Sequence, residues 1–418
     1  MSTSNPHPAP RPRTPSSRVL RALGSLVVGT SLLALLSGCA DFSSETATFT
    51  VQPSLTARAA LPDDTTQPDT PTSPSTSPTD PSPSGSPPPS GSEQPADPCA
   101  PTDAAVIATC LTAPWGLAPL PDGASALVGE RTTGRILQVA KDTDPVLVAQ
   151  IEDIDGTGDG GLLGIALSPS YGEDGLIYAY VTGQTDNHIV RIARGDVPKT
   201  IFAGIPKGAT HNGGRIAFAA DRSLYVGTGD TGNPALASDP ASLAGKVLRL
   251  DEFGKPAESN PTAGSAIYAS GFTQVAGICP TPTGTVAALD QRPAQDLLLP
   301  LTAGKDYTTI TDGDALWTWT AADGGAEDCS MSAGVLASTS LDKQQLTAIE
   351  IAAGNTFTGS PTVLVDGRYG RLLTVVADLQ GLLWFTTSNK DGLGQPVPSD
   401  DRVVVVPSGS SGGEGGPD

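Results

Sequence analysis

Apolar residues along this chain occur in short runs separated by turn residues, and one such unit returns six times. Each copy has an apolar strand, a turn that usually contains Pro or Gly, and a second apolar strand. The copies begin near Trp115, Leu163, Arg215, Val275, Ser332 and Leu373. Their spacing of about 40 to 60 residues is the size of one four-stranded blade of a β-propeller.

Most copies are followed by another short apolar strand, at Arg135, His188, Lys246 and Arg402. A single sheet of this kind leaves both faces exposed, whereas blades stacked around an axis cover one another. The pattern therefore predicts an all-β fold, a six-bladed β-propeller of four-stranded antiparallel sheets over residues 98–407. A pair of packed β-sandwich sheets is the alternative, but it does not explain why the same unit keeps returning.

The segment before the repeats has the order of a secretion signal. Residues 1–39 carry an Arg-rich leader without acids, an apolar run from Leu23 to Leu36, and small residues that end at Cys39. Leu36-Ser-Gly-Cys39 looks like a lipobox, so the sequence predicts a lipoprotein signal peptide and a lipid anchor on Cys39. An ordinary signal peptide or an uncleaved anchor are the alternatives.

Composition then separates the tethering segments from the folded part. Residues 40–97 are rich in Pro, Ser and Thr, and such a segment buries too little apolar surface to offset its ordering entropy. We expect a disordered linker there and a disordered tail over residues 408–418. The prediction is an exported monomer held at the outer face of the cell membrane.

Charge and cysteine content narrow the class further. The formal net charge of −20 argues against a basic phosphate-binding surface, so nucleic acid is not an expected partner. Four cysteines remain after Cys39, and an exported compartment permits two disulfides in three connectivities. We expect Cys99 to pair with Cys110 first, which leaves Cys279 and Cys329.

Several stretches of the repeats resemble the glucose/sorbosone dehydrogenases, the soluble sugar dehydrogenases that depend on pyrroloquinoline quinone (PQQ). Pro114-Trp-Gly-Leu-Ala-Pro is similar to their first blade and Asp159-Gly-Gly-Leu-Leu-Gly to their second. His211-Asn-Gly-Gly-Arg and Leu243-Ala-Gly-Lys match the third, and Gly370-Arg-Leu-Leu fits the last. The resemblance covers nearly the whole predicted propeller.

The resemblance implies hydride transfer from an aldose carbon to the quinone of PQQ, with the electrons passing on to an acceptor. Ca²⁺ and an Arg stabilise the negative charge that grows on the quinone oxygen in such a site. His211 is then the general base. The residues expected to hold the cofactor are Asp159, Asn212, Arg371 and Lys343.

The sequence departs from the family pattern in the fourth copy. The family's Gly-His-Arg-Asn-Pro-Gln-Gly is replaced by Gly271-Phe-Thr-Gln-Val-Ala-Gly, which removes the catalytic Arg. The segment that helps bind Ca²⁺ is thinned, and Pro293 and Asp296 are its remaining candidate ligands. We therefore expect a partly eroded site, in which Arg292 or Lys343 could supply a replacement cation.

Two further hypotheses remain open from the residues. The acidic loop Asp153-Ile-Asp-Gly-Thr-Gly-Asp carries alternating carboxylates that could wrap Ca²⁺, although Asp/Gly runs of this kind are also common plain turns. The alternative function is a non-catalytic propeller that binds a saccharide, a cell-wall glycan or a protein partner.

Overall fold

The computed structural model describes residues 97–101, 103–281, 283–311, 313–332, 334–352 and 356–409. The predicted signal peptide with Cys39, nearly all of the linker and most of the tail lie outside these ranges. Within them, no helix has the length and apolar character needed to cross a membrane.

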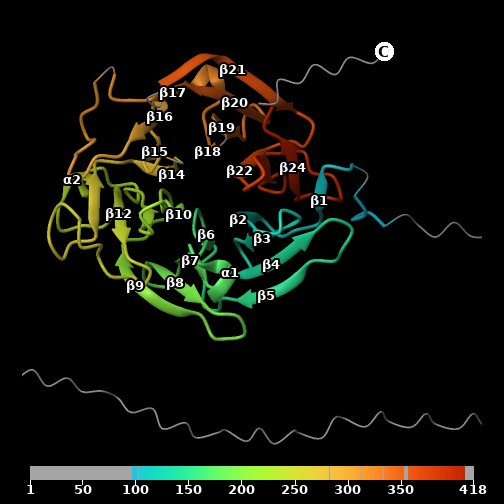
Figure 1. The fold of residues 1–418 in the computed structure, drawn as a ribbon, viewed down its shortest axis with the longest axis horizontal. Helices are drawn as coiled ribbons and strands as arrows, with labels where there is room; N and C mark the ends of the chain where they lie inside the picture. Colours follow the sequence, from blue (N-terminus) through green and yellow to red (C-terminus); the bar gives the residue numbers. More distant parts are fainter. Residues whose placement is uncertain are drawn as a thin grey trace, which may run out of the picture. The chain divides into compact units, whose positions relative to one another are not determined.

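Six four-stranded antiparallel sheets surround a common axis, which confirms the predicted propeller (Figure 1). Blade 1 contains β2 (Pro114–Pro119), β3 (Ser125–Glu130), β4 (Arg135–Ala140) and β5 (Val146–Gln150). Blade 2 contains β6 (Leu162–Leu167), β7 (Ile177–Thr182), β8 (Asn187–Ile192) and β9 (Lys199–Ile205). Blade 3 contains β10 (Ile216–Phe218), β11 (Leu224–Gly227), β12 (Lys246–Leu250) and β13 (Ile267–Ser270).

The other three blades repeat this order. Blade 4 contains β14 (Gln274–Pro280), β15 (Val286–Gln291), β16 (Gln295–Pro300) and β17 (Trp317–Thr320). Blade 5 contains β18 (Asp328–Ser332), β19 (Val335–Ser340), β20 (Gln345–Ala352) and β21 (Thr356–Asp366). Blade 6 contains β22 (Leu372–Ala377), β23 (Leu382–Thr387), β24 (Val403–Pro407) and β1 (Val106–Ala108).

The fifth copy of the repeat begins earlier than the sequence indicated. Its innermost strand is β18, which ends at Ser332 instead of starting there. The reason is that Cys329 and Met331 are buried while Ser330 and Ser332 alternate with them, so the strand has no continuous apolar run.

The ring is closed by the first strand of the chain. β1 lies outermost in blade 6 and pairs with β24, with Val106 opposite Val404. A disulfide joins Cys99 to Cys110, one on each side of β1, as expected. The two ends of the folded part are thereby tied into one sheet.

The core consists of apolar layers between neighbouring blades. Leu162 of blade 2, for example, is fully buried in one cluster with Ile136 of blade 1. Trp384 of blade 6 is buried with Val128 of blade 1. Each blade therefore covers the next, as the repeat predicts.

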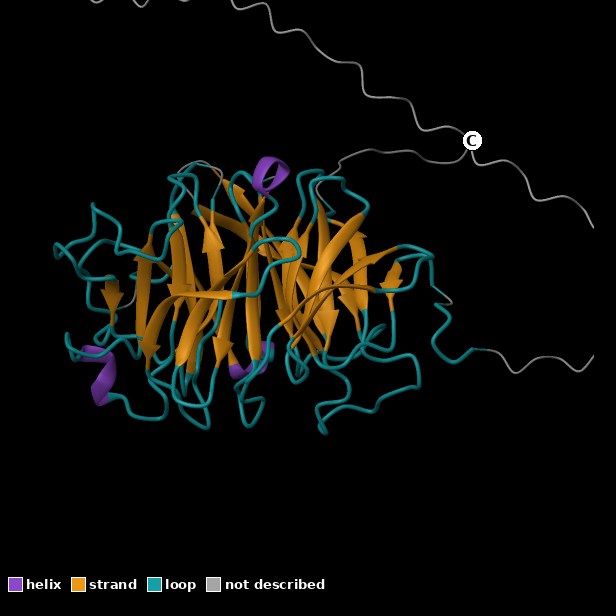
Figure 2. Ribbon diagram, turned by 90° about the horizontal axis from the view of Figure 1, so that it is seen from below, coloured by secondary structure: helices purple, strands orange, loops and turns teal. Residues whose placement is uncertain are grey.

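Chain direction gives the propeller two distinct faces. The loops that precede each innermost strand and those that join each second strand to the third emerge at the same end. We call this end the His211 face, because the loop before β10 carries His211. Figure 2 shows the strands running between two rims of loops, and the short helices α1 (Tyr171–Asp174), α2 (Ala235–Ser238) and η1 (Ala321–Asp323) lie at these rims.

Candidate active site

The His211 face holds a histidine paired with a buried carboxylate. The ring Nδ1 of His211 lies 2.7 Å from Oδ1 of Asp230. The Asp230 side chain is 2% exposed, whereas that of His211 is 39% exposed. The imidazole thus has one nitrogen fixed by a carboxylate and one edge open to a ligand.

Backbone contacts fix both partners of this pair. The His211 N–H donates to Asp159 Oδ2 at 2.8 Å, and the Gly232 N–H donates to Asp230 Oδ1 at 2.8 Å. His211 has a φ of 56°, in the left-handed region that costs free energy for a residue with a side chain. Asp159, predicted as a cofactor residue, lies beside His211 and supports its backbone.

The loop that carries Asp159 is held by a guanidinium. Nη1 of Arg131 donates to the carbonyls of Gly156, Gly158 and Gly160 at 3.3, 2.9 and 2.8 Å. The loop is therefore a turn organised around Arg131.

Asn212 is buried behind His211, and its amide is used within the protein. Its Nδ2 donates to the Gly208 carbonyl, while its Oδ1 accepts from Asn187 Nδ2 and from the Gly208 N–H. The Tyr180 hydroxyl donates to the Asn212 carbonyl. These contacts fix the buried Asn212 side chain, which shapes the loop that carries His211.

Arg371 and Lys343 emerge on the same face from blades 6 and 5. Arg371 Nε lies 2.7 Å from Asp391 Oδ2, and its Nη1 lies 3.3 Å from Oδ1 of Asp342, whose side chain is 79% exposed. Lys343 is exposed, and no carboxylate of the described residues forms an ion pair with it.

Thr273 stands in the segment where the family has its catalytic Arg, and Arg292 does come near. Arg292 Nη2 donates to the carbonyls of Gly271 and Tyr307 at 3.1 and 2.8 Å. Its Nε lies 2.6 Å from Oδ2 of Asp290, which is buried and also accepts the Thr273 N–H. Arg292 is thus engaged in holding the Thr273 loop, and its charge is balanced by Asp290.

Of the two predicted Ca²⁺ ligands, Asp296 has one neighbouring carboxylate. One oxygen of Asp296 accepts the Ala326 N–H at 2.8 Å, and Pro293 is exposed. Glu327 lies close enough to Asp296 for the two charges to repel, and burial raises the pKa of Glu327. Across the described ranges no three His, Cys, Asp or Glu residues are grouped to hold a metal ion.

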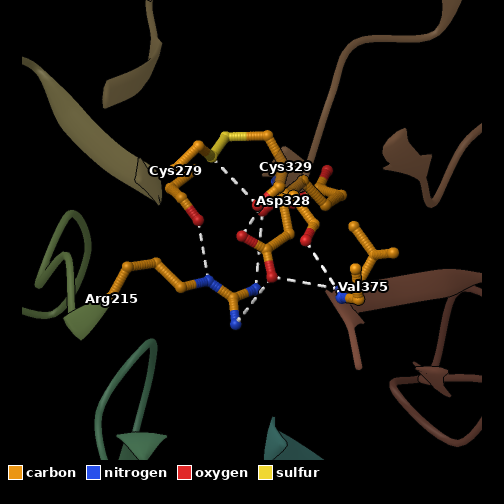
Figure 3. The surroundings of a disulfide bond; sticks show 9 residues. Arg215, Cys279, Asp328, Cys329 and Val375 are labelled. Atoms are coloured by element: carbon orange, nitrogen blue, oxygen red, sulfur yellow. Dashed lines mark hydrogen bonds and ion pairs between the residues drawn. A yellow bond between two sulfur atoms is a disulfide. The ribbon is translucent and has the colours of Figure 1, made fainter. Parts of the chain in front are cut away.

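Beneath the His211 face, Arg215 points toward Asp328 and the disulfide beside it (Figure 3), a contact that the sequence did not predict. Its guanidinium lies 3.7 Å above the Trp115 ring and 3.3 Å from Asp328 Oδ2. A disulfide between Cys279 and Cys329, the second expected pair, joins β14 to β18 beside it. Arg215 is the fifth residue of the His211-Asn-Gly-Gly-Arg motif, and its place in that motif is the sequence signal that could have identified it.

A cavity of about 670 Å³ lies along the axis beyond Arg215. The innermost strands form its wall, with Arg215 and Asp328 among them, and Leu120, Tyr171 and Leu379 line it from loops of the opposite face. Arg215 therefore separates this cavity from His211.

Comparison with known proteins places this propeller in a class of sugar dehydrogenases. The family model for glucose/sorbosone dehydrogenase matches residues 111–308. Quinoprotein glucose dehydrogenase B of Acinetobacter calcoaceticus is 30% identical over 235 residues, which are 46% of this chain and 49% of that protein. An aldose sugar dehydrogenase of Escherichia coli is 28% identical over 242 residues, 53% of this chain and 63% of that protein.

Similarity to a solved structure extends over the propeller. The PQQ-bound form of an aldose sugar dehydrogenase from Streptomyces coelicolor is 36% identical, with a TM-score of 0.67, and the match covers 72% of this chain and 95% of that one. This chain belongs to the glucose/sorbosone dehydrogenase family. It spans about half the length of the first curated relatives that it matches.

Proposed function

We propose that this chain is an oxidoreductase that oxidises an aldose, with His211 taking the hydroxyl proton as hydride leaves the adjoining carbon. The contact between His211 and Asp230 carries the proposal. When Nδ1 donates its proton to Asp230, the Nε2 atom is left unprotonated and can accept the proton of the sugar hydroxyl. The buried Asp230 carboxylate then stabilises the imidazolium that forms.

The residues of the His211 face fit an anionic quinone such as PQQ at two positions. Arg371 could bind a carboxylate through Nη2, since its Nε and Nη1 already pair with Asp391 and Asp342, and the exposed Lys343 offers a second positive charge. When bound, PQQ would supply the group that accepts the hydride. For Ca²⁺, Asp296 and Glu327 are the neighbouring carboxylates, and no third His, Cys, Asp or Glu joins them within the described part of the chain.

We further propose that this chain turns over more slowly than family members that keep the catalytic Arg, because Thr273 stands at the position of that Arg. Thr273 cannot stabilise negative charge as an Arg does, and the charge of Arg292 is balanced by Asp290 at 2.6 Å. Loss of a single stabilising donor costs about a hundred- to a thousand-fold in kcat in well-studied sites. The Thr273→Arg variant is therefore expected to oxidise aldoses faster than the natural chain.

The test is a titration of the protein with PQQ, with and without added Ca²⁺, followed by a dye-linked aldose assay. Saturable binding with turnover that is lost in His211→Ala and kept in His188→Ala supports the proposal. His188 is a suitable control because it also lies near a carboxylate, 3.4 Å from Asp186. Absence of PQQ binding, or equal turnover in both variants, overturns it.

The second candidate is a propeller that binds a saccharide without redox turnover. It is favoured by Arg371, whose charge is already balanced by Asp391 and Asp342. Calorimetric titration with aldoses and cell-wall oligosaccharides in the absence of PQQ distinguishes the two. Binding that is unchanged by PQQ supports this candidate, and binding that requires PQQ excludes it.

The location of the protein is a separate proposal. The Arg-rich leader, the apolar run and the lipobox support export and a lipid anchor on Cys39. Cys39→Ala is expected to abolish labelling by a fatty-acid analogue and to release the protein from the membrane fraction. Unchanged labelling refutes the anchor.

A further inference from the structure

Arg215 links the innermost strands of most blades. From its position directly before β10 it donates through Nε to the Ala276 carbonyl on β14 at 2.7 Å and through Nη1 to Thr374 Oγ1 on β22 at 2.8 Å. It pairs with Asp328 on β18 and stacks on Trp115 of β2. One side chain, 7% exposed, thus contacts four blades besides its own.

The acceptors of Arg215 are themselves fixed. Asp328 Oδ1 accepts the Cys329 N–H at 2.9 Å, and Oδ2 accepts the Val375 N–H at 3.1 Å. The Cys279–Cys329 disulfide covalently joins β14, which carries the Ala276 carbonyl, to β18, which carries Asp328 (Figure 3). The disulfide therefore sets the spacing between two of the groups that hold Arg215.

Arg215 also ends the segment that carries His211. Within this segment His211, Gly213 and Gly214 have φ values of 56°, 69° and 110°, so it is held in an unusual backbone path. Its middle is anchored by the Gly213 N–H, which donates to Gln274 Oε1 at 3.1 Å. Such a segment keeps its shape only while its anchors hold, and the Arg215 side chain is the anchor that reaches the innermost strands of other blades.

We propose that Arg215 is a positioning residue for His211, and that the Cys279–Cys329 disulfide keeps it in place. The inference rests on the proposed role of His211 as a base. Breaking the disulfide lets β14 and β18 separate, which loosens Arg215 and shifts His211 relative to Asp230. The Cys279–Cys329 disulfide would then determine the position of the His211 ring. The Cys99–Cys110 disulfide, on the rim of blade 6, would not.

The experiment reads the imidazole directly in the full chain. The chain has three histidines, so His7→Gln and His188→Gln variants assign the ring signals in a ¹⁵N-histidine spectrum. The ring nitrogen shifts of His211 are compared in Arg215→Lys, in Asp328→Asn and in the Cys279→Ser/Cys329→Ser variant. Cys99→Ser/Cys110→Ser is the matched control, because it removes the other disulfide.

We expect the His211 ring signals to move in the first three variants, while those of His188 stay and the control matches the natural chain. In the PQQ-loaded enzyme we expect kcat to fall by about ten-fold or more with KM little changed. Unmoved His211 signals in folded Arg215→Lys and Asp328→Asn proteins overturn the proposal, as does an equal shift in both disulfide variants.

This design separates the two proposals. The ring signals need no cofactor or substrate, so they report positioning even if no aldose is oxidised. Circular dichroism shows whether the Cys279→Ser/Cys329→Ser variant folds. If it does not, the nearly isosteric Asp328→Asn variant decides whether Arg215 positions His211. If turnover persists and the His211 signals do not move, the proposed oxidoreductase activity stands and only the positioning role of Arg215 is refuted.

Discussion

The pairing of His211 with Asp230 is tested most directly by Asp230→Asn. An Asn side chain has the same shape, so its Oδ1 can still accept from the Gly232 N–H and from the ring Nδ1. The change therefore removes a negative charge while the hydrogen-bonding pattern can persist. Because Asp230 is 2% exposed, water cannot replace that charge.

The magnitude follows from the geometry. A hydrogen bond to a charged group contributes about 1.5–3 kcal/mol. The 2.7 Å distance between His211 Nδ1 and Asp230 Oδ1 is short compared with hydrogen bonds between neutral groups, as expected when the acceptor is a carboxylate. That contribution matters when His211 becomes an imidazolium, which occurs as the proton is taken. With about 1.4 kcal/mol for each factor of ten, kcat is expected to fall about ten- to a hundred-fold.

The assay measures kcat and KM for an aldose with PQQ and a dye acceptor. Asp186→Asn is the matched control, since Asp186 lies beside the other folded histidine, His188, at 3.4 Å. Little change in KM is expected, because Asp230 is too buried to contact the sugar. An Asp230→Asn enzyme with the kcat of the natural chain would refute the role assigned to the pair.

Three further predictions concern stability. Replacing Cys99 and Cys110 by Ser opens a loop with a sequence separation of 11, which should lower the free energy of unfolding in urea by about 3 kcal/mol; no change would contradict it. Arg131→Lys should lower the free energy of unfolding by about 1–2 kcal/mol, because the shorter Lys side chain cannot place its ammonium where Nη1 contacts the three glycine carbonyls; equal stability would show that the loop does not need the guanidinium. The Ala105 N–H and the Tyr369 hydroxyl lower the pKa of Asp103 below that of the unfolded chain, so this carboxylate stabilises the fold above about pH 4 and stops doing so as the pH falls further. Melting temperatures of Asp103→Asn should therefore fall less steeply under acid than those of the natural chain, and parallel curves would count against this contact.

The propeller could be predicted from the sequence because the pattern that defines each blade lies within one short stretch of the chain. Each strand–turn–strand copy carries its own apolar pattern, and only β18 was misplaced, since Ser330 and Ser332 interrupt its apolar residues. The position of His211 followed from a motif. Both disulfides matched the expected order, although the spacing of the cysteines alone allowed three connectivities.

The remainder of the site depends on contacts between residues distant in sequence. Asp391 and Asp342, which balance Arg371, lie 20 and 29 residues from it. The amide of Asn212 is used by Asn187, which lies in another blade. Arg215 looked like the first residue of a strand, and only the closed ring brings it against Asp328 and Trp115.

The arrangement of β1 has a mechanical consequence. The three-residue β1 would be peeled from β24 by a pull from the N-terminal side if the load passed along the backbone. The disulfide between Cys99 and Cys110 transmits the force directly from Cys99 to Cys110, so that the force bypasses β1. There the backbone N–H of Cys110 donates to Ser399, and that of Leu111 donates to Asp401. Tension applied upstream is thereby borne by the loop of blade 6, and the strand that closes the ring is left unloaded.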